Sequence, residues 1–312
     1  MPETSALKKI LDPRSYLDFI RYRLECHREI SRKNYQAVVL YPPGHYYSPL
    51  LDLESLKPGA AGFAFDGEEC WEHIKLFPDR QRNTFEDLLT RFPFLPFPQQ
   101  KTAPYRYYID NAWFFLPDAF TLSALLRREK PRRIVEVGSG FSSAVMLDTL
   151  AQTGESAALT FIEPHPERLH SLLSAADQQT ATILAKPVQE VPLSVFDQLE
   201  AQDILFIDSS HVAKIGSDVG FLLLRILPRL KPGVWIHIHD LFYPFSYPAD
   251  WLHEGRAWNE SLFLRAFLLG NPQFEIMAFN SFAAHSFPEL FQKRFPAFLA
   301  APGASLWFKK IG

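Results

Sequence analysis

The segment Arg133–Ser143, with the sequence RIVEVGSGFSS, constrains the fold of this 312-residue chain more than any other stretch. Its apolar first half predicts a short buried strand, and Gly138 and Gly140 predict a tight turn into a helix that Ser142 or Ser143 caps. Glycine at both positions allows positive φ and lets a ligand approach the backbone, while the helix start offers it N–H groups. The segment therefore predicts a nucleotide-type cofactor site.

Glu136 is the unusual residue of this strand, because its neighbours are apolar. A buried carboxylate costs desolvation free energy unless it finds a hydrogen-bond donor. A ligand that carries an ammonium group at the glycine turn is a suitable partner.

Short apolar strands alternate with helical patterns along the second half of the chain. This alternation predicts a doubly wound α/β fold with a mostly parallel sheet. Two further strands near the C-terminus are joined without a convincing crossover helix, so an antiparallel final pair is expected. The expected strands are 134–137, 159–162, 182–185, 204–207, 234–238, 274–279 and 305–309, and the expected helices are 119–130, 142–153, 166–176 and 218–230.

Acidic residues lie at the ends of four of these strands: Glu136, Glu163, Asp208 and Asp240. The carboxyl ends of parallel strands meet at one edge of a sheet, and open α/β sheets bind their ligands there. These side chains are therefore the first candidates for a functional site.

Residues 1–112 are predicted to form an N-terminal extension to a domain over 113–312. Residues 7–33 have apolar residues at helical spacing and predict one or two amphipathic helices. From Tyr41 onward the chain is rich in proline, glycine and aromatic residues, as in YPPGHYYSP and RFPFLPFP, which predicts ordered loops that cap the substrate or form an interface. The aromatic residues at 105, 107 and 108 either line a substrate mouth or pack in the interior.

The composition limits the classes of partner and the cell compartment that the chain fits. The formal net charge of −3 provides no basic field for nucleic acid or an anionic membrane, so small or neutral substrates are favoured. The two cysteines, Cys26 and Cys70, show no zinc or disulfide spacing, which fits a reducing compartment. With no apolar leader segment and no run of about 18 apolar residues, the expectation is a cytoplasmic protein, and a homo-oligomer stays open.

Four motifs at predicted strand ends, EVGSGFSS, FIEP, FIDSSH and HIHDLF, resemble those of class I S-adenosylmethionine-dependent methyltransferases. The resemblance covers about residues 113–312. It implies a seven-stranded, mostly parallel sheet with an antiparallel last strand, and S-adenosylmethionine lying over the glycine turn.

The resemblance also implies roles for individual residues. Residues of the turn would face the methionine part of the cofactor, Glu163 would bind the ribose hydroxyls, and Gln189 or Glu190 would contact adenine. Asp208 would serve either the amino group of the cofactor or the chemistry. The turn residues concerned are Glu136, Gly138, Ser139, Gly140, Ser142 and Ser143.

A dinucleotide site is the alternative for a G-x-G turn followed by an acid about 20 residues later. Here the third glycine position is Ser143. In addition, Glu136 stands where a dinucleotide fold has an apolar residue. The acid fits a methionine ammonium group better.

The chemistry is expected at Asp208-Ser209-Ser210-His211 and His237-x-His239-Asp240. Methyl transfer to an alcohol needs a group that removes the hydroxyl proton, and a histidine that titrates near neutral pH is suited to it. His211 is the candidate base, with Asp208 beside it. His237 is expected to be a hydrogen-bonded core histidine.

The D-x-x-H spacing and the later acidic position resemble metal-dependent O-methyltransferases, including the catechol type and those acting on macrolide sugars. The resemblance implies a divalent metal, such as magnesium, held by Asp208, His239 and Asp240. A histidine at position 239 favours manganese, iron or zinc over magnesium, or no metal.

The aromatic segment after Asp240 is expected either to shape the acceptor pocket or to form a buried helix stripe. The first interpretation involves Tyr243, Tyr247, Trp251, Arg256 and Trp258, and the second Trp258, Leu262, Phe263 and Ala266. The expected function is O-methylation of a small molecule or saccharide. The alternatives are an N-methyltransferase, although DSSH is not its Asn/Asp-Pro-Pro-Tyr type of loop, and a non-catalytic scaffold that keeps the cofactor fold.

Overall fold

The computed structural model describes residues 74–312 except 94 and 95, together with isolated positions before them (21, 24, 41, 45–48 and 50). The amphipathic helices expected over 7–33 lie almost entirely outside these residues, and so do four of the nine residues of YPPGHYYSP.

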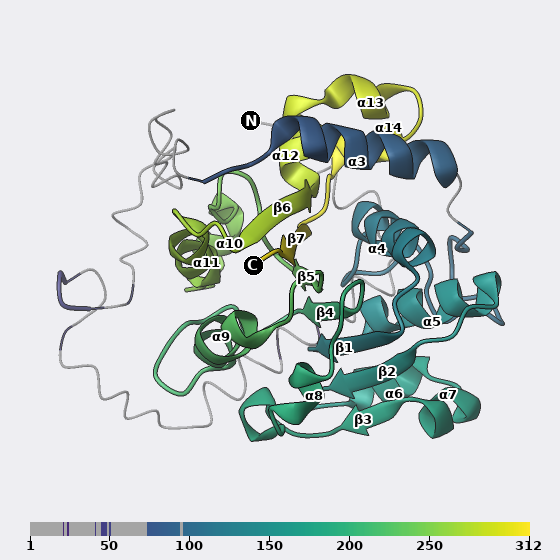
Figure 1. Cartoon of the computed structure of the whole chain (residues 1–312), viewed down its shortest axis with the longest axis horizontal. Coiled ribbons are helices and arrows are strands. Elements are labelled where there is room, and N and C mark those ends of the chain that lie inside the picture. The colour runs from purple at the N-terminus through teal and green to yellow at the C-terminus, as the bar shows by residue number, and fades with distance from the viewer. Residues whose placement is uncertain are drawn as a thin grey trace.

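A seven-stranded sheet crosses the molecule in the order β3-β2-β1-β4-β5-β7-β6 (Figure 1). The first five strands are parallel to one another, and β7 runs antiparallel to both of its neighbours. The predicted doubly wound sheet with a reversed last strand is thereby confirmed. The strands are β1 (Arg133–Val137), β2 (Ala158–Ile162), β3 (Thr182–Leu184), β4 (Ile204–Ile207), β5 (Trp235–Ile238), β6 (Phe274–Phe279) and β7 (Leu306–Lys310).

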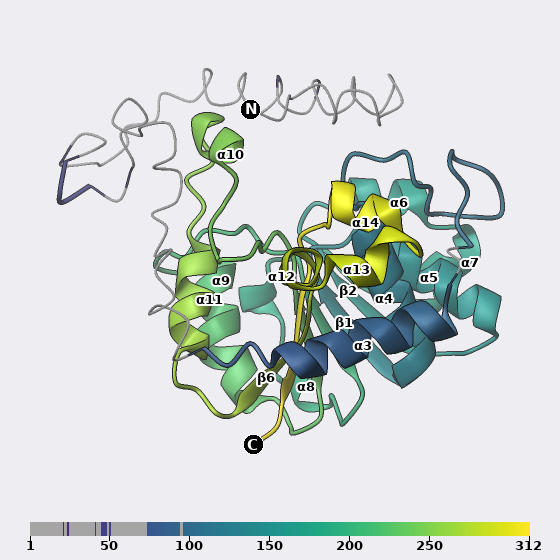
Figure 2. The same ribbon diagram turned by 90° about the horizontal axis from the view of Figure 1, so that it is seen from above.

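Helices cover both faces of the sheet, with α4 and α5 on one face and α9 and α11 on the other (Figure 2). The helices before β5 are α3 (Pro78–Arg91), α4 (Leu116–Glu129), α5 (Phe141–Thr153), α6 (Glu167–Leu172), α7 (Ala175–Thr180), η2 (Val188–Glu190), α8 (Ser194–Asp197), α9 (Asp218–Phe221), η3 (Leu222–Ile226) and η4 (Leu227–Arg229). Those after β5 are α10 (Ala249–His253), α11 (Glu260–Leu268), α12 (Asn280–Ser286), α13 (Pro288–Gln292) and α14 (Pro296–Ala300). None of these helices is long and apolar enough to span a membrane.

Helix α3 lies in a region for which the sequence predicted ordered loops. Its first residue is Pro78, which suits the first turn of a helix, and it ends before Pro93. Its apolar face buries Phe85, Leu88 and Leu89 in the main core, against α4 and β6. The prolines that argued against a helix therefore mark its two ends.

Three other elements differ from the expected ones. The helix expected at 166–176 is two helices, because Ser174 interrupts it and caps α7 by accepting the N–H of Asp177. The helix expected at 218–230 passes from α9 into a π-helical segment, η3, and a 3-10 turn, η4. The connection from β6 to β7 contains three short helices, α12 to α14, although the two strands are antiparallel neighbours as predicted.

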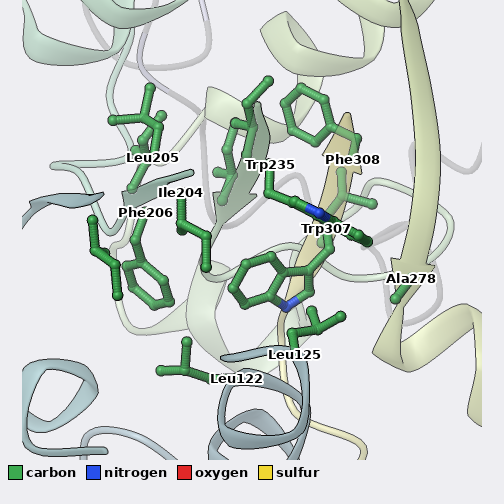
Figure 3. Packing of buried hydrophobic residues seen from close by; sticks show 14 of the residues in the cluster. Leu122, Leu125, Ile204, Leu205, Phe206, Trp235, Ala278, Trp307 and Phe308 are labelled. Atoms are coloured by element: carbon green, nitrogen blue, oxygen red, sulfur yellow. The ribbon is translucent and has the colours of Figure 1, made fainter. Parts of the chain in front are cut away.

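Buried apolar side chains of the sheet and of α4 pack together in the core (Figure 3). Trp307 of β7 is fully buried and lies edge-on to Phe206 of β4, at 6.0 Å between ring centroids. Leu122 and Leu125 of α4 lie against this part of the sheet. Burial of such large apolar side chains fixes the central strands, whose carboxyl ends carry the candidate site.

Candidate active site

The glycine turn after β1 depends on one glycine rather than two. Gly138 has φ +80°, and a Cβ there would overlap the backbone carbonyl of Asp208. Gly140 has φ 178°, which is extended backbone that any residue adopts. The expected positive φ is therefore correct for Gly138 and wrong for Gly140. The turn packs directly on the chain that leaves β4.

The start of α5 also differs in detail from the prediction. Gly140 is the residue that precedes the helix, and Ser142 and Ser143 lie inside its first turn rather than capping it. The hydroxyl of Ser143 still accepts the N–H of Gly140 at 3.0 Å. Both serine hydroxyls donate to the carboxylate of Glu136, Ser142 at 2.5 Å.

Glu136 thus finds its donors within the chain. Its side chain is fully buried, and burial raises its pKa to about 8 despite the two serine hydrogen bonds. The predicted need for a partner is correct, but Ser142 and Ser143 meet it in this structure. The ammonium group of a ligand is not required to explain the buried acid.

Glu163 follows β2 and Gln189 follows β3. In the sheet these two strands lie on one side of β1, and β4, which Asp208 follows, lies on the other. Glu163 accepts the N–H of Ser139 at 3.2 Å and of His165 at 2.8 Å, and burial raises its pKa. Gln189 lies in η2, is exposed, and donates to the carbonyl of Gly216 at 2.9 Å. The Glu163 carboxylate is therefore fixed on the glycine turn.

Arg168 and Trp113 were not predicted to lie at this turn. The guanidinium of Arg168 lies 3.5 Å from the centroid of the Trp113 ring, and its Cδ is the nearest atom that a Cβ on Gly140 would meet. The residues come from α6 and from the loop before α4. No local motif marks either of them, since only the fold brings them to Gly140.

The ends of β4 and β5 bring together Asp208, His211 and Asp240. Nε2 of His211 lies 3.4 Å from Oδ1 of Asp208 and 3.4 Å from Oδ2 of Asp240. One ligand atom from each residue lies within 4.8 Å of the other two, so the group could hold a metal ion. The imidazole is buried, whereas the Asp208 side chain is 34% exposed and can face a ligand.

The charges around His211 define its protonation. Burial alone would lower its pKa, but contacts with Asp208 and Glu260 and the charge of Asp240 raise that pKa well above the ordinary value. Conversely, the His211 contact and the charge of His239 lower the pKa of Asp208 against the effect of its burial. The cluster is therefore a mutually stabilised set of opposite charges.

Glu260 is a site residue that the sequence did not reveal. It is the first residue of α11, its side chain is 1% exposed, and Oε2 lies 2.8 Å from Nδ1 of His211. It is 49 residues from His211 in sequence. The only local signal was an acid at the start of a helix, which usually marks a helix terminus and nothing more.

His237 of β5 and His239, which follows that strand, both lie outside the compact group of possible metal ligands. His237 is fully buried, stacks on Phe206 at 3.8 Å, bonds Ser305 Oγ at 3.0 Å, and burial holds its pKa well below the ordinary range. The prediction of a core histidine is confirmed. Nε2 of His239 lies 3.8 Å from Asp240, as the predicted ligand set requires, but the most compact group at this edge contains His211 instead of His239.

The aromatic segment after β5 lies partly at the site. The Trp258 ring is 4.3 Å from the His211 ring, and Arg256 lies over Trp251 and Trp258, at 4.3 and 5.0 Å. The alternative, a buried stripe along α11, is wrong, because Leu262 and Phe263 are about half exposed while Leu264 and Leu268 are buried. Trp258 therefore belongs to the surroundings of His211.

The strand order, the reversed β7, the glycine turn after β1 and the carboxylate after β2 are those of a class I S-adenosylmethionine-dependent methyltransferase. Residues 135–241, which include the turn and the ends of β4 and β5, match the family model described as "Methyltransferase domain". Residues 135–241 therefore form a region similar to methyltransferase domains, in a sheet with the topology of that class.

Individual relatives are more distant. An uncharacterized protein from Archaeoglobus fulgidus is 28% identical over 174 residues, which cover 52% of this chain and 74% of that protein. The methyltransferase PaMTH1 of Podospora anserina, solved with S-adenosylhomocysteine, is 14% identical over 78% of this chain and 93% of its own, with a TM-score of 0.40. A putative caffeoyl-CoA O-methyltransferase from Staphylococcus aureus is 14% identical over 62% and 82%, with a TM-score of 0.41. Similarity at this level carries no information on the substrate.

Proposed function

We propose that the chain is a methyltransferase that acts on a hydroxyl oxygen of a small molecule or saccharide. The observation that carries the proposal is the cluster of Asp208, His211 and Asp240 at the ends of β4 and β5, packed against the glycine turn. A buried imidazole between two partly exposed carboxylates can orient a hydroxyl and take its proton. An acceptor nitrogen that is already a free base has less need of such a group.

The chain offers suitable groups to S-adenosylmethionine. Glu163 has a carboxylate that can accept two ribose hydroxyls, and Asp208 has a partly exposed carboxylate for the amino group. The buried hydroxyl of Ser139 has no hydrogen-bond partner among the residues that the structure describes. Gln189 is the proposed adenine contact, while Glu136 supports the turn through Ser142 and Ser143. When bound, the cofactor supplies an electrophilic methyl group on a sulfonium.

His211 is proposed to take the acceptor proton at Nε2. In the transfer, the methyl–sulfur bond breaks and the new carbon–oxygen bond forms, S-adenosylhomocysteine leaves, and the hydroxyl proton passes to the base. Because Asp208 and Glu260 raise the pKa of His211, its neutral form is a stronger base but is less populated at neutral pH. Asp208 and Asp240 stabilise the imidazolium that results.

The same three residues are the proposed holders of a divalent cation. Two carboxylates and one imidazole form a mixed oxygen and nitrogen donor set, which suits manganese, iron or zinc as well as magnesium. When bound, such a cation lowers the pKa of an acceptor hydroxyl. In either case Asp208 and Asp240 fix the position of the acceptor oxygen.

The test is a screen of phenols, sugars and amines for cofactor-dependent methylated product, with and without a chelator. We expect product from a hydroxyl acceptor, and His211→Ala to lower turnover about 10²-fold or more while S-adenosylhomocysteine still binds. His170→Ala, on the exposed side of α6, is the matched control. Full turnover in His211→Ala would remove that residue from the mechanism, and product from amines alone would replace O-methylation by N-methylation.

Calorimetry with S-adenosylhomocysteine tests the remaining alternative, a non-catalytic scaffold. We expect binding, because Glu163 is already held on the glycine turn by the Ser139 N–H. A chain that binds neither S-adenosylhomocysteine nor S-adenosylmethionine would support the scaffold. Loss of activity on chelation, restored by manganese or magnesium, would support the cation site.

A further inference from the structure

Glu260 makes a closer contact with His211 than either Asp208 or Asp240 does. Its Oε2 lies 2.8 Å from Nδ1, and both side chains are almost fully buried. A carboxylate can only accept a hydrogen bond, so Nδ1 carries a proton in the charged ring and keeps it when the ring becomes neutral. The other nitrogen, Nε2, then faces Asp208 and Asp240.

The second oxygen of Glu260 is also engaged by the loop that follows β4. Ser209 Oγ donates to Oε1 at 2.9 Å, and the same Oγ accepts the N–H of His211 at 3.1 Å. Rotation of the Glu260 carboxylate would therefore break contacts with both Ser209 and His211. Neither oxygen is left for the usual role of an acid at a helix N-terminus.

The backbone repeats this connection. The carbonyl of His211 accepts the N–H groups of Asn259 and Glu260, at 3.0 and 3.1 Å. The Asn259 side chain accepts the N–H of Ala213 at 2.6 Å and donates to its carbonyl at 3.2 Å. The backbone of His211 itself has φ +60°, a conformation that a non-glycine residue holds only when its surroundings fix it.

From this geometry we propose that Glu260 is the positioning residue of His211, which selects the Nδ1–H form of its ring and aims Nε2 at the space between Asp208 and Asp240. The segment 258–260 does so from three directions, with the carboxylate on Nδ1, two N–H groups on the carbonyl, and the Trp258 ring 4.3 Å from the imidazole. The role that this gives to Nε2 in turnover rests on the proposed function. The orientation of the ring does not.

The direct test is ¹⁵N NMR of the His211 imidazole, assigned by the signal lost in His211→Asn and read at a pH where the ring is neutral. In the unmodified protein we expect the Nδ1–H tautomer. In Glu260→Ala we expect a shift toward the Nε2–H tautomer, because the carboxylate no longer accepts the Nδ1 proton. Glu260→Gln keeps an amide oxygen that can accept this proton, so we expect it to restore most of the original tautomer. Glu289→Gln, an exposed acid in the first turn of α13, is the matched control.

Turnover gives the second readout. We expect Glu260→Ala to lower kcat about 10- to 100-fold with little change in KM for S-adenosylmethionine, and Glu260→Gln to recover part of the loss. Unchanged affinity for S-adenosylhomocysteine shows that each variant is folded. An unaltered tautomer in Glu260→Ala would overturn the proposal, and so would equal losses of kcat in the alanine and glutamine variants. If the acceptor screen gives no methylated product but the tautomer still shifts in Glu260→Ala, the proposed function is overturned and the positioning role of Glu260 is supported.

Discussion

Gly138 is held by two independent constraints, its φ of +80° and the Asp208 carbonyl that occupies the place of a side chain. We therefore expect Gly138→Ala to lower the free energy of unfolding by at least about 2 kcal/mol, since strain and overlap add. Gly140→Ala is the matched control, because Gly140 is extended and a Cβ there would only touch Arg168 at 3.4 Å. We expect it to cost less than about 1 kcal/mol. Urea unfolding without cofactor measures both, and similar losses in the two variants would contradict this account.

Residues with local signals were predictable from the sequence, and those with distant partners were not. The glycine turn, Glu136 and Asp208 follow from strand-end chemistry, because the carboxyl ends of parallel strands share one edge. The pairing of Glu260 with His211 joins α11 to the loop after β4, and no spacing along the chain encodes it. The exchange of His239 for His211 in the acidic cluster has the same origin, since the turn at His211 swings its ring back toward Asp208.

At the scale of elements, Arg106 ties the loop before α4 to two helices. Its guanidinium bonds Asp177 of α7 at 2.6 and 2.7 Å and Asp148 of α5 at 2.8 Å. Its backbone N–H and that of Tyr107 add two further bonds to Asp148, at 2.9 and 2.8 Å. The side chains of Asp148 and Asp177 are 2% and 8% exposed, so neither carboxylate can turn to water when the cation is removed.

We therefore expect Arg106→Ala to lower the free energy of unfolding by about 3 kcal/mol or more, because it leaves two nearly buried carboxylates without their cation. Arg229→Ala is the matched control. Arg229 pairs with Asp197 at 2.8 Å, but both side chains are more than 40% exposed, and such pairs contribute about 1 kcal/mol at most. Chemical denaturation of the two variants side by side gives the comparison. A small loss in Arg106→Ala would mean that water replaces the guanidinium.

Elements with strong periodicity were placed well, and those that depend on tertiary contacts were not. The strands of the parallel part of the sheet lie within one residue of their expected ends, because each is a short apolar run between turn signals. The sequence does not predict helix α3, because the prolines that flank it favour loops, whereas Phe85, Leu88 and Leu89 form a helical stripe in the core. The short helices between β6 and β7 have too few residues for a periodic signal.

At the scale of the whole molecule, buried ionisable groups link stability to pH. Burial raises the pKa of Glu136 to about 8, with the charge of Asp208 adding to the effect. Above its ordinary pKa of 4.5 the unfolded chain loses the Glu136 proton, while the folded chain keeps it up to about pH 8. The folded state then binds more protons than the unfolded state, so stability falls as pH rises through this window. His237 acts in the opposite direction below its ordinary pKa of 6.5, since burial lowers its pKa and the folded chain resists protonation there.

The effect of Glu136 on the free energy of unfolding can therefore be measured between about pH 6.5 and 8. We expect the free energy of unfolding to decrease across it by an amount on the order of a kcal/mol or two, because each pKa unit corresponds to about 1.4 kcal/mol. Glu136→Gln should flatten the curve, since the amide does not titrate and can still bond Ser142 and Ser143. Glu155→Gln, on the surface beside Lys130, should leave the slope as it is. His211 contributes a slope of the same sign, so part of the decrease should survive in Glu136→Gln. If the free energy of unfolding of Glu136→Gln decreases with pH as steeply as that of the unmodified protein, the decrease comes from the charges at the ends of β4 and β5. Glu136 would then be ionised in the folded protein.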